Sequence, residues 1–308
     1  MSEDKISRRE FLKKAGLIGV GVIGVSIFGE EILGILTPAE AATQSNVMAI
    51  AKKGTPSQLV NNAVKALGGI GKFVKKGQSV CIKPNLAWDT SPSGAANVNP
   101  DVLLAVIQLC EKAGASRITV IEHSCDNASA TFKSSGAQAV VAKTKARLIS
   151  ADKESYYKEI SIPKGKTLKK DKILKDILNS DVFINLPICK VHGGSIVTAS
   201  MKNLMGATWD RGYWHRSGLH QCIADLSTAI KPDLIILDAV NILLTNGPKG
   251  PGEIKKVNQV IAGTDPVAID TYAAKLLGKD PKNIDFIKAA AALKIGTMDL
   301  TKVSTKSV

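Results

Sequence analysis

Two kinds of hydrophobic pattern alternate along the chain. Short apolar runs predict buried strands, and stretches with apolar residues three or four positions apart predict amphipathic helices. This alternation is typical of βαβ units built around a parallel sheet. The run at Asp233–Leu237 is so apolar that both of its faces must be covered. The predicted strands are Val47–Ala51, Ser79–Lys83, Ile118–Glu122, Asp181–Leu186, Asp233–Leu237 and Val257–Ala262.

The segments between these strands have helical spacing. The predicted helices are Pro56–Leu67, Pro100–Ala113, Lys133–Ala146, Leu219–Ile230, Pro266–Leu277 and Ile284–Leu293, with a helical turn at Ala199–Met205. Short strands are expected at Arg147–Ile149 and Glu159–Ile162. We expect the basic stretch Lys164–Lys175 to be a solvated face and helix start, and the tail Lys302–Val308 to be frayed. The pattern predicts a single doubly wound α/β domain with a mostly parallel sheet.

The first residues carry the features of an export signal. The pair Arg8-Arg9 is followed by Phe-Leu-Lys, an apolar run from Ala15 to Gly29, and an A-x-A pattern at Ala39–Ala41. These features predict a cleavable twin-arginine signal peptide at residues 1–41. An amphipathic first helix and an uncleaved membrane anchor are the alternatives. The apolar run is shorter than the roughly 20 residues that cross a bilayer, so no permanent membrane span is expected.

Export would leave an α/β domain of residues 42–308, which the twin-arginine export machinery delivers to the periplasm or another extracytoplasmic space. The charge balance is basic, at +14 for the whole chain and +15 without residues 1–41. Such an excess suits an anionic small molecule, an acidic surface or an electronegative redox partner. Nucleic acid is not an expected partner, because the chain carries no motif for it and is predicted to lie outside the cytoplasm.

The cysteines do not form a recognisable cluster motif. Five occur, at positions 81, 110, 125, 189 and 222, and no two have C-x-x-C spacing. A ferredoxin-type cluster needs closely spaced thiolates, so the sequence contains no intrinsic motif for one. An odd count also leaves at least one thiol unpaired in an oxidising compartment.

Reactive side chains follow the predicted strands. Ligands of open parallel sheets bind at the carboxyl ends of the strands, so these side chains would meet at one rim. For each residue alone, the start of an ordinary loop is the alternative. As a set they favour a site, because Lys, His, Cys and Asp differ from the Gly, Ser and Asn of ordinary turns. The strand-end residues are Lys83, Asn85, His123, Cys125, Cys189, Lys190, His192 and Asp238.

Two of these strand ends combine a histidine with a cysteine. His123 lies close to Cys125 in the sequence, and Cys189 lies close to His192. Zinc and other transition metals accept mixed nitrogen and sulfur ligands, which makes His123, Cys125 and Cys189 candidate metal ligands. A Cys125–Cys189 disulfide and two free thiols are the alternatives, because neither pair has zinc-finger spacing.

The segment Cys189–Arg216 concentrates recognition side chains. Small residues before Lys202 and Asn203 allow backbone amides to approach an anion, and Lys83 adds a compact positive charge. Neither residue lies in a Walker or G-x-G-x-x-G motif, so nucleotide binding is only weakly supported.

The end of this segment is an aromatic loop. We expect Trp209 and Trp214 to shield a ligand, with Arg211 between them as a cofactor-binding residue. An unperturbed histidine titrates near pH 6.5 and can transfer protons. The candidates for proton transfer are Lys190, His192 and His215.

Several motifs occur in a fixed order between Ser79 and Leu277, namely CIKPNL, CKVH, MKNLMG, a GP-x-G loop and AGTDPVAID. Together they resemble the domain of unknown function 362 family, and WDRGYWHR followed by LHQCIADL and KPDLIILDA is similar to an exported, twin-arginine-dependent branch. Many members carry a ferredoxin-like segment, which implies redox chemistry, but this chain lacks such a segment. The resemblance implies site roles for Lys83, Asn85, Lys190, His192, Lys202 and Asn203.

We therefore expect an exported α/β protein that binds an anionic small molecule or a metal-bearing cofactor in a strand-end crevice. The preferred hypothesis is a redox-linked enzyme of undefined reaction with an unknown cofactor, for which a transition metal is one candidate. The alternative is a non-catalytic binding or accessory protein of a periplasmic redox system, which would bind the same ligand without turnover.

Overall fold

The computed structural model describes residues 47–308, and the predicted signal peptide lies outside the described residues. The strands are β1 (Val47–Ala51), β2 (Ser79–Pro84), β3 (Arg117–Glu122), β4 (Arg147–Ser150), β5 (Tyr157–Ser161), β6 (Lys170–Leu174), β7 (Val182–Leu186), β8 (Ile188–His192), β9 (Ile196–Thr198), β10 (Leu234–Leu243), β11 (Ile254–Gly263) and β12 (Ser304–Ser307). The helices are α2 (Pro56–Ala66), α3 (Pro100–Lys112), α4 (Ala128–Ser134), α5 (Ala137–Val141), α6 (Lys175–Asn179), α7 (Ser200–Asn203), α8 (Arg211–Ser217), α9 (Leu219–Ala229), α10 (Pro266–Leu276) and α11 (Asp285–Ala292).

Most of these strands form one large sheet, in the order β12-β1-β11-β10-β7-β2-β3-β4. The strands β10, β7, β2, β3 and β4 run parallel, whereas β11 is antiparallel to both β10 and β1. The strand β8 lies beside β10 and pairs with the short β9. The winding reverses at β2, because β3 and β4 extend the sheet on one side and β7 and β10 on the other. The crevice at such a reversal is the usual ligand site of an open α/β sheet.

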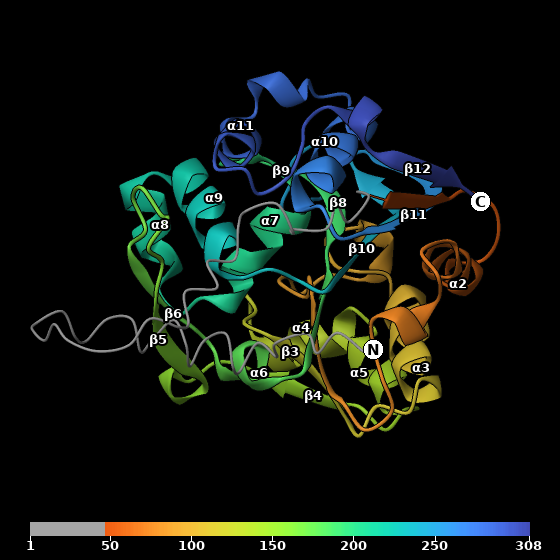
Figure 1. Ribbon diagram of the computed structural model, residues 1–308. Helices are drawn as coiled ribbons and strands as arrows, with labels where there is room; N and C mark the ends of the chain where they lie inside the picture. The colour runs from red at the N-terminus through yellow and green to blue at the C-terminus, as the bar shows by residue number, and fades with distance from the viewer. Residues whose placement is uncertain (1–46) are drawn as a thin grey trace, which may run out of the picture.

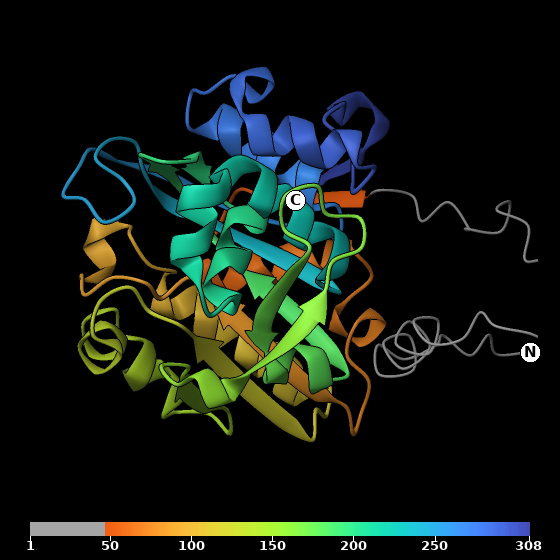
Figure 2. The same cartoon turned by 90° about the vertical axis from the view of Figure 1, so that its left-hand side faces the viewer.

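Helices cover both faces of the sheet (Figure 1). The helices α2, α3 and α5 pack on one face, in a hydrophobic cluster that includes Leu59 and Ile107. The helices α7, α9, α10 and α11 belong to a second cluster, which includes Phe183, Ile223 and Phe286. The β5–β6 hairpin lies in front of the central sheet in Figure 2. Burial on both faces explains why the central strands are continuous apolar runs.

Local sequence sets where the helices begin. Thr55 and Gln58 form a reciprocal capping box ahead of α2, and Pro56 occupies the first helical position. Asn99 caps α3, and Asp265 accepts hydrogen bonds from two backbone N–H groups at the start of α10.

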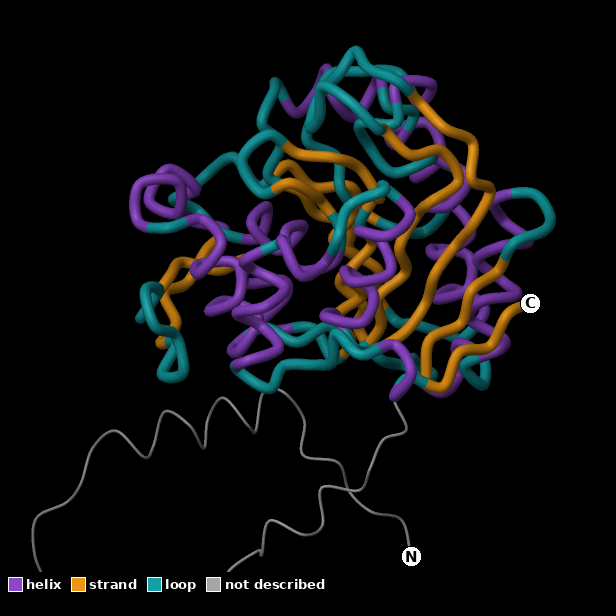
Figure 3. The backbone as a smooth tube through the Cα atoms, turned by 90° about the horizontal axis from the view of Figure 1, so that it is seen from above, coloured by secondary structure: helices purple, strands orange, loops and turns teal. Residues whose placement is uncertain are grey.

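The predicted α/β class, with a mostly parallel sheet flanked by helices, is confirmed. Three predicted segments differ from the structure in whole or in part. Lys133–Ala146 is split between α4 and α5, because Gly136 adopts a left-handed conformation with φ of 76°. The stretch Lys164–Lys175 has mostly exposed lysines and ends at the start of α6, as predicted, but its residues Lys170–Leu174 form the strand β6, which pairs with β5. The tail Lys302–Val308 is not frayed, since β12 pairs in parallel with β1 at the sheet edge (Figure 3).

The strands near the predicted site also extend beyond their predicted ends. Ile188–His192 forms the strand β8 where a loop was expected, and β10 continues past Asp238 to Leu243. Both Lys190 and His192 therefore sit on a paired strand rather than on a loop. No helix within residues 47–308 is long and apolar enough to cross a membrane.

Candidate functional site

A pocket of about 320 Å³ opens at the carboxyl ends of β2 and β3, where the winding of the sheet reverses. Its walls also include residues from β8, α7 and α8. The predicted site residues that line it are Lys83, Asn85, His123, Cys125, Lys190, His192, Lys202, Asn203, Arg211 and His215.

A buried ion pair joins the ends of β2 and β3. The Nζ atom of Lys83 lies 2.8 Å from Oε2 of Glu122, and both side chains are almost completely buried. The same ammonium group donates to the carbonyl oxygen of Pro84 at 2.8 Å. Burial lowers the pKa of Lys83, and the Glu122 carboxylate opposes that shift. This lysine has an internal counter-ion and needs no ligand to compensate its charge.

Glu122 and Gly206 complete this part of the site, and the sequence reasoning did not select either. A Cβ atom at Gly206 would lie 2.4 Å from Oε1 of Glu122 and 2.7 Å from Nζ of Lys83. A side chain at this position would displace the buried ion pair, which gives a reason for glycine as the last residue of the MKNLMG motif. The available signal for Glu122 was its position at the end of an apolar strand, the same position that drew attention to Lys83.

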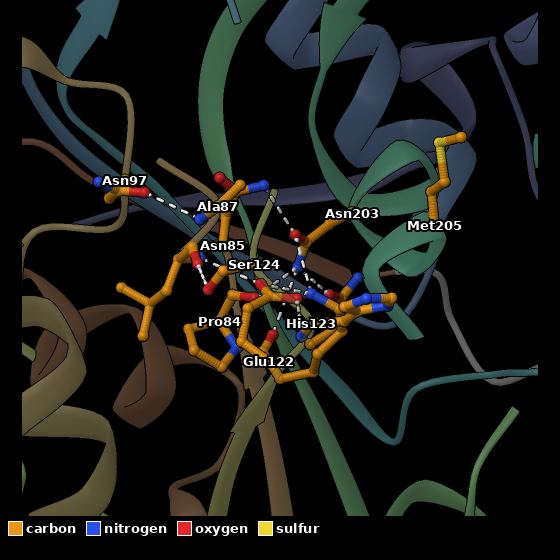
Figure 4. Close-up of polar contacts among 12 residues, drawn as sticks. Pro84, Asn85, Ala87, Asn97, Glu122, His123, Ser124, Asn203 and Met205 are labelled. Carbon is orange, nitrogen blue, oxygen red and sulfur yellow. Dashed lines mark hydrogen bonds and ion pairs between the residues drawn. The ribbon is translucent and has the colours of Figure 1, made fainter. Parts of the chain in front are cut away.

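A network of side-chain amides joins β2, β7 and β8 to α7. Asn203 accepts a hydrogen bond from Nδ2 of Asn85 at 2.9 Å and donates to Oδ1 of Asn185 at 2.8 Å. Figure 4 shows Asn203 reaching from its helix toward the strand ends. Lys190 donates to Oδ1 of Asn85 at 3.1 Å and also to the carbonyl oxygen of Ala96. Because each amide is engaged on more than one side, the network holds Lys190 in a defined position.

Lys202 differs from Lys83 and Lys190 in its partners. It exposes 8% of its surface, and within residues 47–308 its one hydrogen-bond partner is the thioether sulfur of Met205, at 3.0 Å. A thioether is a weak acceptor, so most of the donor capacity of Lys202 is unused. Burial lowers the pKa of Lys202 to about 8, with Cys125 opposing the shift and other cations adding to it.

The pocket contains more buried positive charge than negative charge. Lys190 exposes 1% of its surface, and burial together with the charge of Lys202 lowers its pKa to about 7. Three lysines thus share a pocket wall in which the one carboxylate, among the described lining residues, belongs to Glu122. An ammonium group removed from water is unfavourable unless an opposite charge compensates it. An anion in the pocket would supply that charge.

Arg211 ties the aromatic segment to the loop after β3. Its guanidinium group donates to the carbonyl oxygens of His123 and Ser124, at 3.0 and 3.1 Å, and to Sγ of Cys125 at 3.1 Å. The segment expected as a loop is helical from Arg211 onward, and Asp210 caps this helix, α8. The guanidinium group is thereby held at the pocket with two of its five N–H donors still unused.

The tautomer of His192 is set by the hydrogen bonds that its ring accepts. Its Nδ1 accepts hydrogen bonds from the N–H groups of Gly194 and Ser195, at 3.0 and 3.3 Å, which leaves the ring proton on Nε2. Burial and the charge of Lys202 lower its pKa to about 3. His192 is therefore a neutral hydrogen-bond donor rather than a base that titrates near pH 6.5. His215 also lines the pocket but is exposed, and burial lowers its pKa as well.

Two predicted ligand-binding residues lie in the interior of the protein, away from the pocket. Trp214 is completely buried, and its Nε1 donates to Oδ2 of Asp171 at 2.8 Å. It does not shield a ligand, because the helix α8 turns it toward the core. Asp238 accepts hydrogen bonds from the backbone N–H groups of Asn99 and Val240. Its carboxylate therefore fixes the backbone around β10 instead of facing the pocket.

The three predicted metal ligands are not brought together. Cys189 is completely buried and its Sγ donates to the carbonyl oxygen of Ala273, because neighbouring strand residues face opposite ways and Lys190 faces the pocket. His123 and Cys125 both line the pocket, but residues 47–308 contain no group of three or more His, Cys, Asp or Glu side chains that could hold a metal ion. The five cysteines all lie in the described chain and none forms a disulfide, so the Cys125–Cys189 alternative is wrong.

The aromatic wall of the pocket comes from Trp88, which the sequence did not predict as a site residue. Trp88 lines the pocket, and Nζ of Lys249 lies 5.8 Å from the centre of its ring. Pro248, from the Gly- and Pro-rich loop after β10, lines it as well. Trp209 packs beside His123 instead, with ring centres 5.6 Å apart and an angle of 13° between the planes. One tryptophan near the end of β2 thus takes the place expected for two tryptophans near α8.

Comparison with known proteins gives one family and several distant relatives. A family model described as "Domain of unknown function (DUF362)" matches residues 80–275. The thylakoid-associated protein sll1697 of Synechocystis sp. is 27% identical over 238 residues, which cover 75% of this chain and 72% of that protein.

The solved structures that resemble the chain are more distant. The lactate racemase apoprotein from Thermoanaerobacterium thermosaccharolyticum has 12% identity and a TM-score of 0.39, over 74% of this chain and 56% of that chain. A protein from Thermotoga maritima has 10% identity and a TM-score of 0.41, over 79% of this chain and 59% of that chain. The chain spans less than two thirds of either structure.

Proposed function

We propose, from the premise that this chain belongs to the family described as Domain of unknown function (DUF362), that it binds a small anionic molecule in the strand-end pocket. The family membership confirms the resemblance inferred from the motifs between Ser79 and Leu277. The observation that carries the proposal is the excess of buried positive charge. Lys190 and Lys202 line the pocket without an ion-pair partner among the described residues, unlike Lys83.

The other groups in the pocket suit a carboxylate or a phosphate. Arg211 presents a planar guanidinium group, which matches the paired oxygens of such anions. His192 adds a neutral N–H donor, and Trp88 adds an apolar wall. The volume of about 320 Å³ lies at the small end of the range for ligand pockets. A molecule with one or two anionic groups on a short carbon skeleton fits this combination.

We further propose that the ligand is a substrate, as in the hypothesis of a redox-linked enzyme. Lys190, with a pKa of about 7, can exchange a proton at neutral pH. Residues 47–308 contain no group of three or more His, Cys, Asp or Glu side chains that could hold a metal ion, so we favour a ligand that binds through its anionic groups. The accessory-protein hypothesis uses the same pocket and differs only in predicting no turnover.

Export through the twin-arginine route is part of the same proposal, and it rests on the sequence of residues 1–41. Replacement of the arginine pair (Arg8→Lys with Arg9→Lys) should leave the protein in the cytoplasmic fraction, whereas the natural sequence should direct it across the membrane. Equal export of both forms would contradict this part of the proposal and leave the pocket unaffected.

Titration calorimetry with inorganic phosphate, sulfate, propanoate and pyruvate tests anion binding by the purified protein. Loss of one charged hydrogen bond is worth about 1.5–3 kcal/mol, so Arg211→Gln and Lys202→Met should each raise the Kd about 10- to 100-fold. Lys158→Met is the matched control, because Lys158 is exposed on β5 and its substitution removes the same charge away from the pocket. The proposal fails if no anion binds, or if the control weakens binding as much as the pocket variants.

A further inference from the structure

We propose that Nζ of Lys202 forms a covalent imine with the carbonyl carbon of a small carboxylate-bearing ketone or aldehyde, such as a 2-oxo acid, bound in this pocket. The inference rests on the proposed function, because the carboxylate of such a molecule is the anion that the pocket would hold. It adds a substrate class and a nucleophile to that function.

The hydrogen-bond partners of the three buried lysines single out Lys202. The ammonium group of Lys83 has a carboxylate and a carbonyl oxygen as acceptors, and that of Lys190 has an amide oxygen and a carbonyl oxygen. Oxygen acceptors of this kind stabilise the protonated form and occupy its hydrogens. Lys202 has a thioether sulfur instead. It is the lysine of this wall whose nitrogen is least committed to other groups.

Burial is the main cause that favours the free amine of Lys202, which is the form that attacks a carbonyl carbon. The cations that face it from other elements are Arg211 on α8 and Lys83 on β2, while the thiol of Cys125, after β3, acts in the opposite sense. A desolvated lysine beside other cations is a known way to activate an amine for imine formation. Its lowered pKa, about 8, agrees with that environment.

The rest of the pocket can hold the two ends of such a substrate. Lys190 uses two of its three N–H donors internally, and Arg211 also keeps unused donors, so a carboxylate can bind between them. His192 is a neutral N–H donor in the same pocket, suited to a carbonyl oxygen that gains negative charge during attack. These groups would orient the carbonyl carbon toward Lys202.

The proposed step balances without an oxidant or a reductant. The lone pair of the amine forms a bond to the carbonyl carbon, and the carbonyl oxygen takes a proton to give a carbinolamine. The carbon–oxygen bond then breaks, the nitrogen lone pair forms the C=N bond, and the oxygen leaves as water. Both hydrogens of the water come from the amine, so one amine and one carbonyl compound yield one imine and one water.

Reductive trapping tests the inference directly. The full protein is incubated at pH 7.5 with pyruvate and sodium cyanoborohydride, which reduces an imine to a stable secondary amine, and modified lysines are located by peptide mass spectrometry. Lys202 should be modified about tenfold or more above the average of the exposed lysines, since its lower pKa leaves far more free amine at this pH. Propanoate has the same charge without the carbonyl group and should suppress the labelling of Lys202.

Two variants separate this inference from the proposed function. Lys202→Arg replaces the nucleophilic amine with a guanidinium group, so the trapped adduct at position 202 should be lost even at pyruvate concentrations that saturate the anion site of the variant, as measured with propanoate. Lys158→Arg is the control and should keep the adduct. If propanoate binds to the natural protein and no lysine is trapped above the surface background, the imine is overturned while anion binding stands. If neither propanoate nor pyruvate binds, the proposed function falls and the imine with it.

Discussion

Two parts of the same pocket wall carry buried lysines, one with a carboxylate counter-ion and one without. At the ends of β2 and β3, Lys83 lies 2.8 Å from the carboxylate of Glu122. On α7, Lys202 meets a thioether sulfur and, among the described residues, no carboxylate within ion-pair distance. Both side chains are buried, yet the first region is neutral as a pair and the second keeps an excess positive charge.

The difference separates a structural role for Lys83 from the binding role that we propose for Lys202. A buried ion pair with additional hydrogen bonds is complete within the protein, and its loss is felt as a loss of stability. A buried ammonium group without a counter-ion costs stability in the free protein and favours any ligand that brings a negative charge. Burial alone therefore does not identify a ligand-binding lysine, whereas burial without a partner does.

The largest effect is expected from breaking the buried ion pair between Lys83 and Glu122. Glu122→Gln leaves the Lys83 ammonium buried without its counter-ion, which should lower the free energy of unfolding by about 3–5 kcal/mol. Urea denaturation measures this change. Glu159→Gln is the matched control, because Glu159 pairs with Lys170 on an exposed surface and should change stability by less than about 1 kcal/mol. A loss below about 1 kcal/mol for Glu122→Gln would contradict a structural role for the pair.

A smaller effect is expected in the pH dependence of stability, which depends on Lys190 and Lys202, the two buried lysines without a counter-ion within residues 47–308. The pKa values of about 7 for Lys190 and about 8 for Lys202 lie below the unfolded value of about 10.4. The unfolded state therefore binds more protons above pH 7, and stability should rise from pH 7 to 8.5 by up to about 1.4 kcal/mol per pH unit for each lysine. Asp270, with a pKa of about 7, is still partly protonated in the lower part of this window, and the raised pKa values of the buried Cys110 and Cys222 thiols matter near pH 8.5, so both reduce the rise below this upper bound.

The variant Lys202→Met measures how much Lys202 alone contributes to this pH dependence of stability. It removes a buried charge that has no counter-ion, so stability at pH 7 should stay equal or rise by about 1 kcal/mol. The slope between pH 7 and 8.5 should become shallower than that of the natural protein. Urea titrations at several pH values measure both quantities, and an unchanged slope would show that Lys202 keeps an ordinary pKa.

The smallest effect is expected from an ion pair with the same length but greater exposure. Lys249 and Asp126 lie 2.8 Å apart near the pocket, but their side chains are 48% and 25% exposed. Lys249→Met should change the free energy of unfolding by less than about 1 kcal/mol, because water and salt screen the pair. A loss as large as that of Glu122→Gln would mean that distance, rather than burial, sets the strength of these pairs.

The helices and strands could be predicted where the local sequence is sufficient to determine them. The strands β2 and β7 are apolar on both faces, and the capping residues Thr55 and Asn99 define helix starts, so short stretches of sequence were sufficient. The tail at Ser304–Ser307 is entirely exposed and polar, and it is a strand because β1 pairs with it. That pairing depends on a distant segment and leaves no signal in the local sequence.

The same distinction applies to the site. Lys83 and Lys190 could be identified because polar residues that follow apolar strands are confined to one edge of a parallel sheet. Lys202 could be identified because small residues precede it and it lies in the MKNLMG motif. The partner of Lys83 could not, because one carboxylate at a strand end resembles a loop start until the neighbouring strand is known. Trp214 was assigned to the ligand because it stands in a polar segment, but α8 directs its ring into the core.

The position of β1 has a consequence for the order of events in the cell. Among the described strands β1 is synthesised first, yet its neighbours in the sheet are β11 and β12, which are synthesised last. This edge of the sheet therefore cannot close before β11 and β12 have been synthesised. An incomplete chain presents an unpaired apolar strand, which is a typical target for chaperones and a typical start of aggregation. Closure of this sheet edge thus requires synthesis of the chain as far as Ser307.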